Sequence, residues 1–277
     1  MSISVLILTR NEEQDLPGCL ASVAWSDDVH VLDSHSTDRT CELAEAAGAK
    51  ITKRVFDDYS KQRNFGLREL PYRHPWVLIL DADERIPAAL ADELRARAAD
   101  APAEVAGYRI RRRDFFLGRW LKHAQASPFY IRFVRPARVA YSPRIVNEVL
   151  EPLPGGVIAD LAKPFDHYPF SKGLDHWFAK HNQYSRMEAL QIRQDRAAGV
   201  TFRVSQAFFA RDFNQRRWHQ KQLFYRLPLR PLCKFLILYV LKRGFLDGYP
   251  GLLYCQLQAC YERMIVAKCA ELDAGGC

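Results

Sequence analysis

Three acidic side chains follow an apolar run in the stretch VLILDADERI at residues 77–86. Asp81 and Asp83 are two residues apart, so on an extended strand both side chains point to the same side. Two carboxylates held this close repel each other unless a cation or a proton offsets their charge. A divalent cation such as Mg²⁺ or Mn²⁺ would do so and could bind diphosphate oxygens at the same time. A helix cap ahead of Pro87 would explain one acid and leave the others unexplained.

Other polar clusters also follow apolar runs. Asp33 begins the stretch Asp-Ser-His-Ser-Thr-Asp, in which the later residues can cap a helix while Asp33 could accept hydrogen bonds from a base or a ribose. Thr9, Asn11 and Glu12 follow the first apolar run of the chain. Arg63 lies in Lys-Gln-Arg-Asn, and a guanidinium there could bind diphosphate oxygens in bidentate fashion, although a solvated helix face would look similar.

The first hundred residues alternate apolar runs with helical patterns. We expect strands at residues 3–8, 29–32, 49–52 and 76–80, and helices at residues 11–23, 39–47, 60–70 and 87–99. Apolar strands separated by helices indicate a mostly parallel sheet covered on both faces. Ligands bind beyond the carboxyl ends of such strands, where the polar clusters lie. Residues 105–170 mix strand-like pieces, at 105–110 and 130–134, with Pro and Gly, and the pattern is helical after residue 171.

Composition narrows the class of protein. The 277 residues are 48% hydrophobic and 26% charged, as in a folded globular protein. We expect neither a secretory leader nor a membrane-spanning helix, because the first apolar run has no basic leader and the longest run in the tail has only seven residues. Seven cysteines without a CxxC pair argue against a zinc site and favour a reduced, cytoplasmic setting.

The positive charge is unevenly distributed. The net charge is +8, yet residues 1–100 hold 12 Lys/Arg against 18 Asp/Glu. Residues 109–144 hold ten Lys/Arg and a single acid, Asp114. Such a field attracts anions, which could be phosphates, an anionic membrane surface or nucleic acid, although a merely solvated basic face would look the same. The loop after the first strand has no G-x-G-x-x-G, which argues against a dinucleotide-binding dehydrogenase.

Taken in order, these motifs resemble the nucleotide-sugar half of a family 2 glycosyltransferase. The resemblance rests on four stretches, which are Ile-Leu-Thr-Arg-Asn-Glu-Glu at 7–13, Asp-Ser-His-Ser-Thr-Asp at 33–38, Gln-Arg-Asn at 62–64 and Leu-Asp-Ala-Asp-Glu at 80–84. Phe-Asp-His-Tyr-Pro at 165–169, Lys-His-Asn-Gln-Tyr at 180–184 and Gly-Phe-Leu-Asp-Gly-Tyr at 244–249 resemble the lipopolysaccharide-core β-glucosyltransferase subgroup. The resemblance implies an α/β GT-A fold, Rossmann-like, with a helical tail.

The resemblance also implies domains and site residues. It divides the chain into a nucleotide-sugar half at 1–104, an acceptor half at 105–170 and a basic helical tail at 171–277 that could lie on a membrane or pack on the domain. Donor-binding residues would be Thr9, Asn11, Glu12, Asp33, Arg63 and Asp81. Metal ligands would be Asp81, Asp83 and His167. The catalytic base would be Glu148, and acceptor contacts would come from Arg111, Arg113 and Asn147, the last standing where the subgroup has a histidine.

The implied function is inverting transfer of a hexose, with UDP-glucose as the expected donor, to a sugar hydroxyl of a lipopolysaccharide-core or similar lipid-linked glycan. The implied cofactor is Mg²⁺ or Mn²⁺, and the implied location is the cytoplasmic face of the inner membrane, with peripheral attachment and no nucleic acid partner. Two alternatives remain open. A sugar-phosphate nucleotidyltransferase also uses paired acids but would need a Gly-rich loop after the first strand. A non-catalytic basic adaptor for membrane or nucleic acid would not need the acids.

Overall fold

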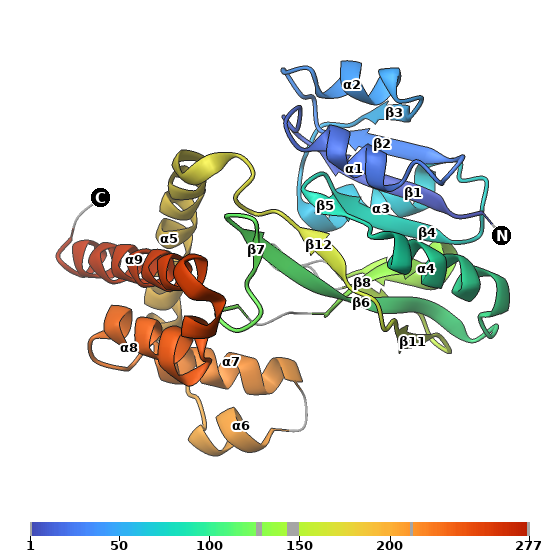
Figure 1. Cartoon of the computed structure of the whole chain (residues 1–277). Coiled ribbons are helices and arrows are strands. Elements are labelled where there is room, and N and C mark those ends of the chain that lie inside the picture. The colour runs from blue at the N-terminus through green and yellow to red at the C-terminus, as the bar shows by residue number, and fades with distance from the viewer. Residues whose placement is uncertain (1, 126–128, 143–149, 211–212, 276–277) are drawn as a thin grey trace. The chain divides into compact units, whose positions relative to one another are not determined.

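The computed structural model describes residues 2–125, 129–142, 150–210 and 213–275. The chain divides into two compact units, of which the first comprises Met1–Phe115 with Ser127–Ser171 and the second Phe116–Ala126 with Lys172–Cys277. Figure 1 labels the elements of both units.

The first unit is an α/β layered structure. Its strands are β1 (Ser4–Thr9), β2 (Val29–Asp33), β3 (Lys50–Lys53), β4 (Val77–Asp81), β5 (Glu84–Arg85), β6 (Val105–Phe116), β8 (Phe129–Val134), β9 (Val139–Tyr141), β10 (Leu150–Pro152), β11 (Val157–Asp160) and β12 (Phe165–His167). Its helices are α1 (Leu16–Ser22), α2 (Thr40–Ala46), α3 (Tyr59–Glu69), α4 (Ala88–Asp100) and the short 3₁₀ turn η1 (Pro136–Arg138). The four strands and four helices expected in the first hundred residues are confirmed. The first helix begins later than expected, at Leu16, and Asn11, where the expected helix would begin, adopts a left-handed φ of 56° that a right-handed helix does not accommodate.

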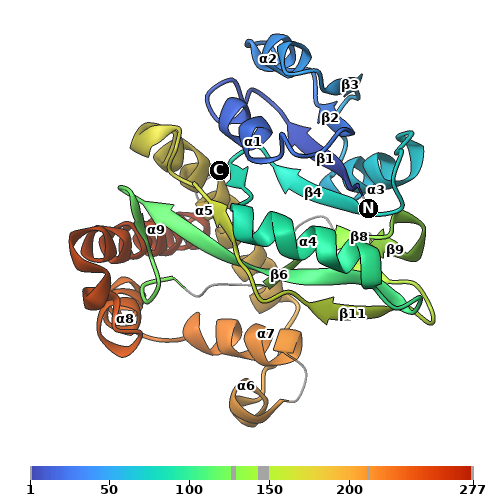
Figure 2. The same ribbon diagram turned by 45° about the vertical axis from the view of Figure 1, so that its right-hand side comes forward.

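The main sheet follows the order β3-β2-β1-β4-β8-β6-β12-β5. β3, β2, β1 and β4 are parallel, β8 is antiparallel to both of its neighbours, and β12 runs parallel to β6. Figure 2 shows β2, β1 and β4 side by side. The chain leaves β1 toward β2 and β3, and then returns to place β4 on the other side of β1. Ligands of open α/β sheets bind at such a reversal of strand order.

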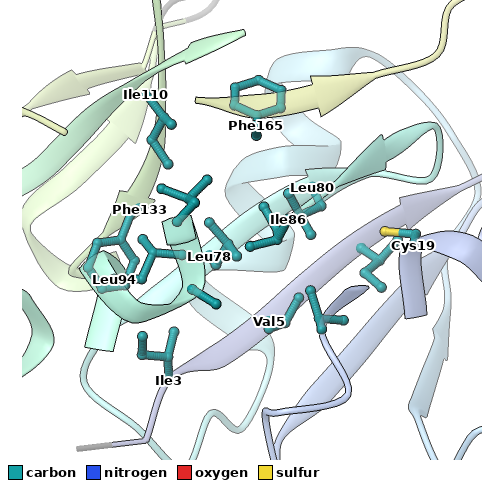
Figure 3. Packing of buried hydrophobic residues seen from close by; sticks show 14 of the residues in the cluster. Ile3, Val5, Cys19, Leu78, Leu80, Ile86, Leu94, Ile110, Phe133 and Phe165 are labelled. Atoms are coloured by element: carbon teal, nitrogen blue, oxygen red, sulfur yellow. The ribbon is translucent and has the colours of Figure 1, made fainter. Parts of the chain in front are cut away.

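Alternating residues of the central strands pack against helices on opposite faces of the sheet. Val5 of β1 and Leu80 of β4 pack with apolar side chains of α1 and α4 in one buried cluster, which Figure 3 shows from close by. Leu6 and Ile79 point the other way and pack with Leu67 of α3. This period-two division is the reason why most positions of these strands are apolar, and not only every second one. The expected parallel sheet with helices on both faces is confirmed.

A buried carboxylate fastens the amino-terminal ends of these strands. Asp28 is fully buried and accepts hydrogen bonds from Ser4 Oγ at 2.5 Å, Lys50 Nζ at 2.6 Å and Arg73 N at 2.8 Å, with His30 Nε2 at 3.0 Å. Burial alone would raise its pKa, but the donors outweigh burial and hold the pKa of Asp28 below its usual range. The carboxylate therefore joins β1, β2, β3 and the loop before β4.

The second unit is mostly helical. Its elements are β7 (Arg119–Trp120), α5 (Gly173–Ala197), α6 (Val204–Phe209), α7 (Phe213–Phe224), α8 (Arg230–Leu236), the π-helical turn η2 (Ile237–Leu241), the 3₁₀ turn η3 (Gly244–Asp247) and α9 (Gly248–Asp273). α5 and α9 share a small core that includes Ile192 and Ile265. Arg230 of α8 forms a buried ion pair with Glu262 of α9. The expected helical tail is confirmed, and no helix among the described residues is both long and apolar enough to cross a bilayer.

Candidate functional site

The polar ends of β1, β2 and β4 lie together at one edge of the sheet. Thr9 is the register partner of Asp33, and Leu8 is the register partner of Asp81. Thr9 Oγ1 donates a hydrogen bond of 2.9 Å to Asp33 Oδ1. Because β1 and β4 flank the reversal of strand order, these side chains mark the expected ligand-binding edge.

The loops after β1 and β2 hold each other in place. Asp33 is fully buried, and its carboxylate accepts hydrogen bonds from Ser36 N at 2.8 Å and Ser36 Oγ at 2.5 Å. Asn11 Oδ1 accepts a hydrogen bond from Thr37 N at 2.8 Å, and Glu12 N donates to a threonine hydroxyl at the start of α2. Thr9, Asn11, Glu12 and Asp33 are thus gathered as the sequence suggested, and their contact with a nucleotide stays a prediction.

Asp81 lies between two arginines. Arg63 of α3 donates to Asp81 Oδ1 at 3.0 Å, and Arg132 of β8 donates to Asp81 Oδ2 at 2.7 Å. Burial would raise the pKa of Asp81, but Arg132 and Arg63 outweigh it and lower that pKa below its usual range. Any cation that approached Asp81 would compete with these guanidinium groups.

Glu84 is the second carboxylate that Arg132 contacts. Its side chain is 1% exposed and accepts from Arg132 Nη2 at 2.6 Å and from Asp81 N at 3.0 Å. Burial raises the pKa of Glu84, and the nearby charge of Asp81 raises it further, while Arg132 opposes both. Glu84 therefore fixes the backbone and the arginine that hold Asp81, and it does not face a ligand.

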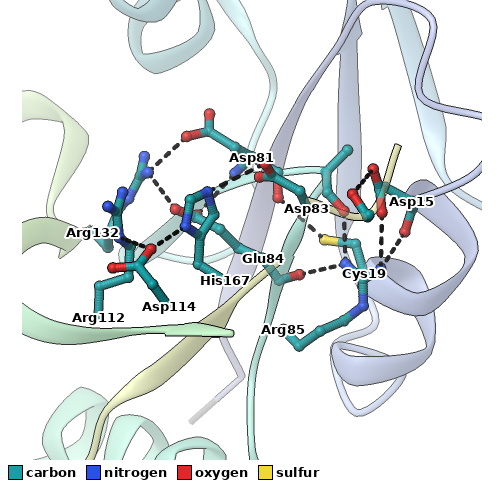
Figure 4. Close-up of polar contacts among 12 residues, drawn as sticks. Asp15, Cys19, Asp81, Asp83, Glu84, Arg85, Arg112, Asp114, Arg132 and His167 are labelled. Carbon is teal, nitrogen blue, oxygen red and sulfur yellow. Dashed lines mark hydrogen bonds and ion pairs between the residues drawn. The ribbon is translucent and has the colours of Figure 1, made fainter. Parts of the chain in front are cut away.

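Asp83 contacts a histidine that arrives from a distant part of the sequence. His167 of β12 places Nε2 3.2 Å from Asp83 Oδ2, and its Nδ1 is hydrogen-bonded to Asp114 Oδ1. Arg112 forms an ion pair of 2.9 Å with the same oxygen of Asp114. Figure 4 shows His167 between the two carboxylates. Burial would lower the pKa of His167, but Asp83 and Asp114 together raise it to about 9.

Asp83 and His167 are suited to hold a divalent cation. Two atoms bound at about 2.1 Å and at a right angle lie about 3.0 Å apart, close to the 3.2 Å between these two atoms. Asp114 fixes Nδ1 and so leaves Nε2 to face Asp83, as outer-shell carboxylates do for metal-binding histidines. Among the described residues no group of three or more His, Cys, Asp or Glu is arranged to hold a metal. Two protein ligands, of which one is a nitrogen, suit Mn²⁺ better than Mg²⁺, which prefers oxygen ligands, and either cation would take its remaining oxygens from substrate phosphates and water.

The Gln-Arg-Asn stretch of α3 connects three parts of the site. Gln62 donates to Ser34 Oγ at 3.1 Å beside the end of β2, and Arg63 reaches Asp81 at the end of β4. Asn64 pairs with both backbone groups of Tyr141 at 2.9 Å. Three consecutive side chains of one helix therefore position three separate segments.

The residues expected at the acceptor fall into two sets. Arg111 and Arg113 lie on β6, and Arg113 forms an ion pair of 2.6 Å with Asp166 of β12. Glu148 and Asn147, expected as the base and an acceptor contact, lie outside the described residues. The roles of all four stay predictions.

Sequence reasoning missed Arg132 and Asp114 as members of the site. Asp114 did carry a signal, since it is the one acid among ten basic residues at 109–144. Arg132 also carried one, because it is a charged residue inside the otherwise apolar and aromatic stretch FYIRFV at 129–134. A charge at a buried strand position requires a partner.

Comparison with known proteins places this site in a family. Residues 4–152, more than half of the chain, match the sequence profile of glycosyl transferase family 2. A lipopolysaccharide core biosynthesis glycosyltransferase, LpsC of Rhizobium meliloti, is 32% identical over 123 residues, which are 43% of this chain and 44% of the relative. An uncharacterized glycosyltransferase of Rickettsia bellii is 38% identical over 93 residues, which are 33% of this chain and 31% of the relative. The chain thus spans less than half the length of these curated relatives.

Among solved structures, this chain is similar to glucosyl-3-phosphoglycerate synthase from Mycobacterium tuberculosis in a complex with Mn²⁺, uridine diphosphate and phosphoglyceric acid. The match covers 60% of this chain and 70% of the synthase chain. The TM-score is 0.41 at 16% identity, which says nothing about the substrates of this protein. The family match extends from β1 to β10 and contains Asp33, Arg63, Asp81 and Asp83. This chain belongs to glycosyl transferase family 2 and has an α/β fold of the GT-A type.

Proposed function

We propose that this glycosyltransferase moves a hexose from a UDP-sugar, with UDP-glucose as the expected donor, to a sugar hydroxyl of a lipopolysaccharide-core or similar lipid-linked glycan, with inversion at the anomeric carbon. The observation that carries the donor half is the Asp83–His167 pair beside the arginine-bound Asp81 at the reversal of strand order. The likeness to the Rhizobium meliloti enzyme supports the acceptor half.

Each charge at the site has a role in binding a nucleoside diphosphate. Asp83 and His167 would hold the divalent cation, with Asp81 as the third expected ligand in competition with its arginines, and the bound cation would neutralise charge that develops on the leaving diphosphate. Arg63 is oriented by Asp81 and would contact the diphosphate in bidentate fashion. Thr9 and Asp33, the last residues of β1 and β2, would contact the uracil, with Asn11 and Glu12 of the loop after β1 supporting the nucleoside.

The chemistry requires one base and no covalent intermediate. Glu148 would take the proton from the acceptor hydroxyl as that oxygen attacks the anomeric carbon. Attack from the side opposite the leaving UDP forms the new C–O bond as the old one breaks, which inverts the configuration. Arg111, Arg113 and Asn147 would contact the acceptor, whose core sugars can carry carboxylates and phosphates that a basic strand attracts.

The proposal also assigns the parts of the chain and the place of action. Residues 1–104 would bind the donor, residues 105–170 would bind the acceptor, and the basic tail at 171–277 would associate with the membrane. A lipid-linked acceptor would hold the enzyme at the cytoplasmic face of the inner membrane, as a peripheral protein.

Calorimetric titration with UDP-glucose, in the presence and absence of Mn²⁺, tests the donor half. We expect binding that depends on Mn²⁺ and is lost in Asp83→Asn. Asp92→Asn is the matched control, because Asp92 is an exposed acid on α4 that pairs with Arg95 at 2.8 Å. Absence of binding to UDP-glucose, UDP-galactose and UDP alike would refute the donor assignment. Transfer that persists in Glu148→Gln would refute the assignment of the base.

A further inference from the structure

One side of the second unit exposes large apolar side chains at helical spacing. Leu232, Leu236 and Val240 follow one another at intervals of four residues, which places them on one face of α8 and η2, and Leu229 lies directly before α8. Leu241 and Phe245 continue the face toward η3. All six side chains are between 45% and 75% exposed. We call these six residues the α8–η3 surface.

The opposite side of the same segment is already used for packing. Leu238 is buried, and Arg230 is buried in its ion pair with Glu262 of α9. η3 is held by the buried Asp247, whose Oδ2 accepts hydrogen bonds from His123 N at 2.9 Å and Ala124 N at 2.7 Å. The α8–η3 surface is therefore presented by a fixed scaffold, and its exposure does not come from an unpacked helix.

The segment that carries this surface has charge of one sign. Residues 213–246 contain eight Lys/Arg and no Asp or Glu. Lys242 and Arg243 are exposed and lie between Leu241 and Phe245 in the sequence. Asp247, the next acid along the chain, is buried and adds no exposed negative charge. An apolar face bordered by cations matches a surface that is apolar inside and anionic at its boundary.

We propose that the α8–η3 surface docks on an anionic lipid bilayer, with its leucines among the acyl chains and Lys242 and Arg243 at the headgroups. Amphipathic helices with this composition lie in the plane of the membrane interface. A second copy of this chain is a poorer occupant, because a two-fold dimer through this face would set the same basic residues against each other. The proposal deepens the proposed function and rests on it for the lipid-linked acceptor.

Sedimentation with phosphatidylcholine vesicles, prepared with and without phosphatidylglycerol, tests the docking. We expect the full chain to bind only the vesicles with phosphatidylglycerol and to dissociate as salt is raised. Lys242→Gln/Arg243→Gln should weaken binding about 30-fold at low salt, at about fivefold for each basic residue. Leu236→Asp/Leu241→Asp should abolish sedimentation. Circular dichroism checks that each variant is folded.

Matched controls and a second readout separate the outcomes. Leu190→Asp and Arg193→Gln change exposed residues of α5 and should bind vesicles as the unchanged protein does. Equal vesicle binding by the α8–η3 variants would overturn the docking, as would a dimer in solution that Leu236→Asp/Leu241→Asp dissociates. UDP-glucose binding, measured on the same samples without vesicles, should be unchanged in all variants. Vesicle binding without any UDP-glucose binding would refute the proposed donor and leave the docking standing.

Discussion

Arg132 is the residue whose removal should disturb the site most. Its side chain on β8 is 6% exposed, and its Nη2 contacts both Asp81 Oδ2 at 2.7 Å and Glu84 Oε1 at 2.6 Å. Arg132→Met keeps most of the aliphatic volume and removes the charge. The two carboxylates then lose their shared cation without a gain of solvent.

The loss of the arginine should leave Glu84 less well compensated than Asp81. Asp81 would keep Arg63 at 3.0 Å and is 35% exposed, so water and a second guanidinium still compensate it. Glu84 is 1% exposed and, among the contacts that the structure describes, would keep the N–H of Asp81. Removing one partner of a buried pair costs about 3–5 kcal/mol, because the other charge stays uncompensated. We expect Arg132→Met to lower the free energy of unfolding by about that amount.

A double-mutant cycle tests which of the two carboxylates causes the loss of stability in Arg132→Met. In the Arg132→Met background, Glu84→Gln removes the buried charge and should recover more than half of the lost stability, while Asp81→Asn should recover less. Urea unfolding followed by circular dichroism gives the free energies. The reasoning is refuted if Arg132→Met costs less than about 1 kcal/mol, well below the range for a buried pair, or if Asp81→Asn rescues better than Glu84→Gln.

Three further substitutions test other parts of the structure. Because the pKa of Asp28 is lowered in the folded state, its carboxylate stabilises the fold at any pH above the ordinary Asp pKa of about 3.9, and this contribution is lost as the pH falls toward the folded-state pKa. Asp28→Asn should therefore have a lower urea midpoint than the unchanged protein at pH 7, and its midpoint should fall less steeply below pH 4. Gly251→Ala should cost about 1–3 kcal/mol in thermal unfolding, because its new Cβ would lie 2.3 Å from the backbone oxygen of Gly244. Asp114→Asn should weaken Mn²⁺ binding, measured by calorimetry, by about 10–100-fold, since Asp114 orients His167.

Two of these substitutions have a control variant, one on the same helix and one in the same class of contact. Gln256→Ala changes an exposed position of α9 and should leave the melting temperature nearly unchanged. Asp160→Asn breaks an exposed pair with Arg109 and should leave Mn²⁺ affinity intact. An Asp114→Asn protein with unchanged Mn²⁺ affinity would mean that His167 is held by its strand alone. An acid-unfolding profile that Asp28→Asn does not change would mean that the buried carboxylate is not ionised in the native state.

The hydrophobic pattern of the sequence predicted the central strands of the sheet, because their burial shows in their own residues. The runs at 3–8, 29–32 and 76–80 are apolar at every position except Ser4 and His30, because both faces of their strands are covered, and this pattern identified β1, β2 and β4. The acids at their ends were also visible, because Asp33 and Asp81 directly follow apolar residues. The end of β6 could not be predicted from the sequence. Arg111, Arg112 and Arg113 interrupt the apolar alternation, so a strand predicted to stop near residue 110 continues to Phe116.

The completed site depends on pairings between strands that are distant in sequence. β12 places His167 opposite Asp114 of β6, and β8 places Phe133 opposite Leu78 of β4, next to Arg132. Neither register follows from a hydrophobic pattern, because a short strand such as β12 carries too few residues to define its partner. His167 could be named from a family motif, whereas its partner Asp114 required the structure.

The charges of the site predict that the proposed donor and the proposed cation would bind as a unit. Arg63 and Arg132 balance Asp81 and Glu84, while Arg112 and His167 balance Asp114 and Asp83. A diphosphate alone would add negative charge to this balanced set and take arginine contacts from carboxylates. A divalent cation alone would displace the proton of His167 and add charge beside two arginines. Bound together, the two ligands offset each other, so each should raise the affinity for the other by the same factor.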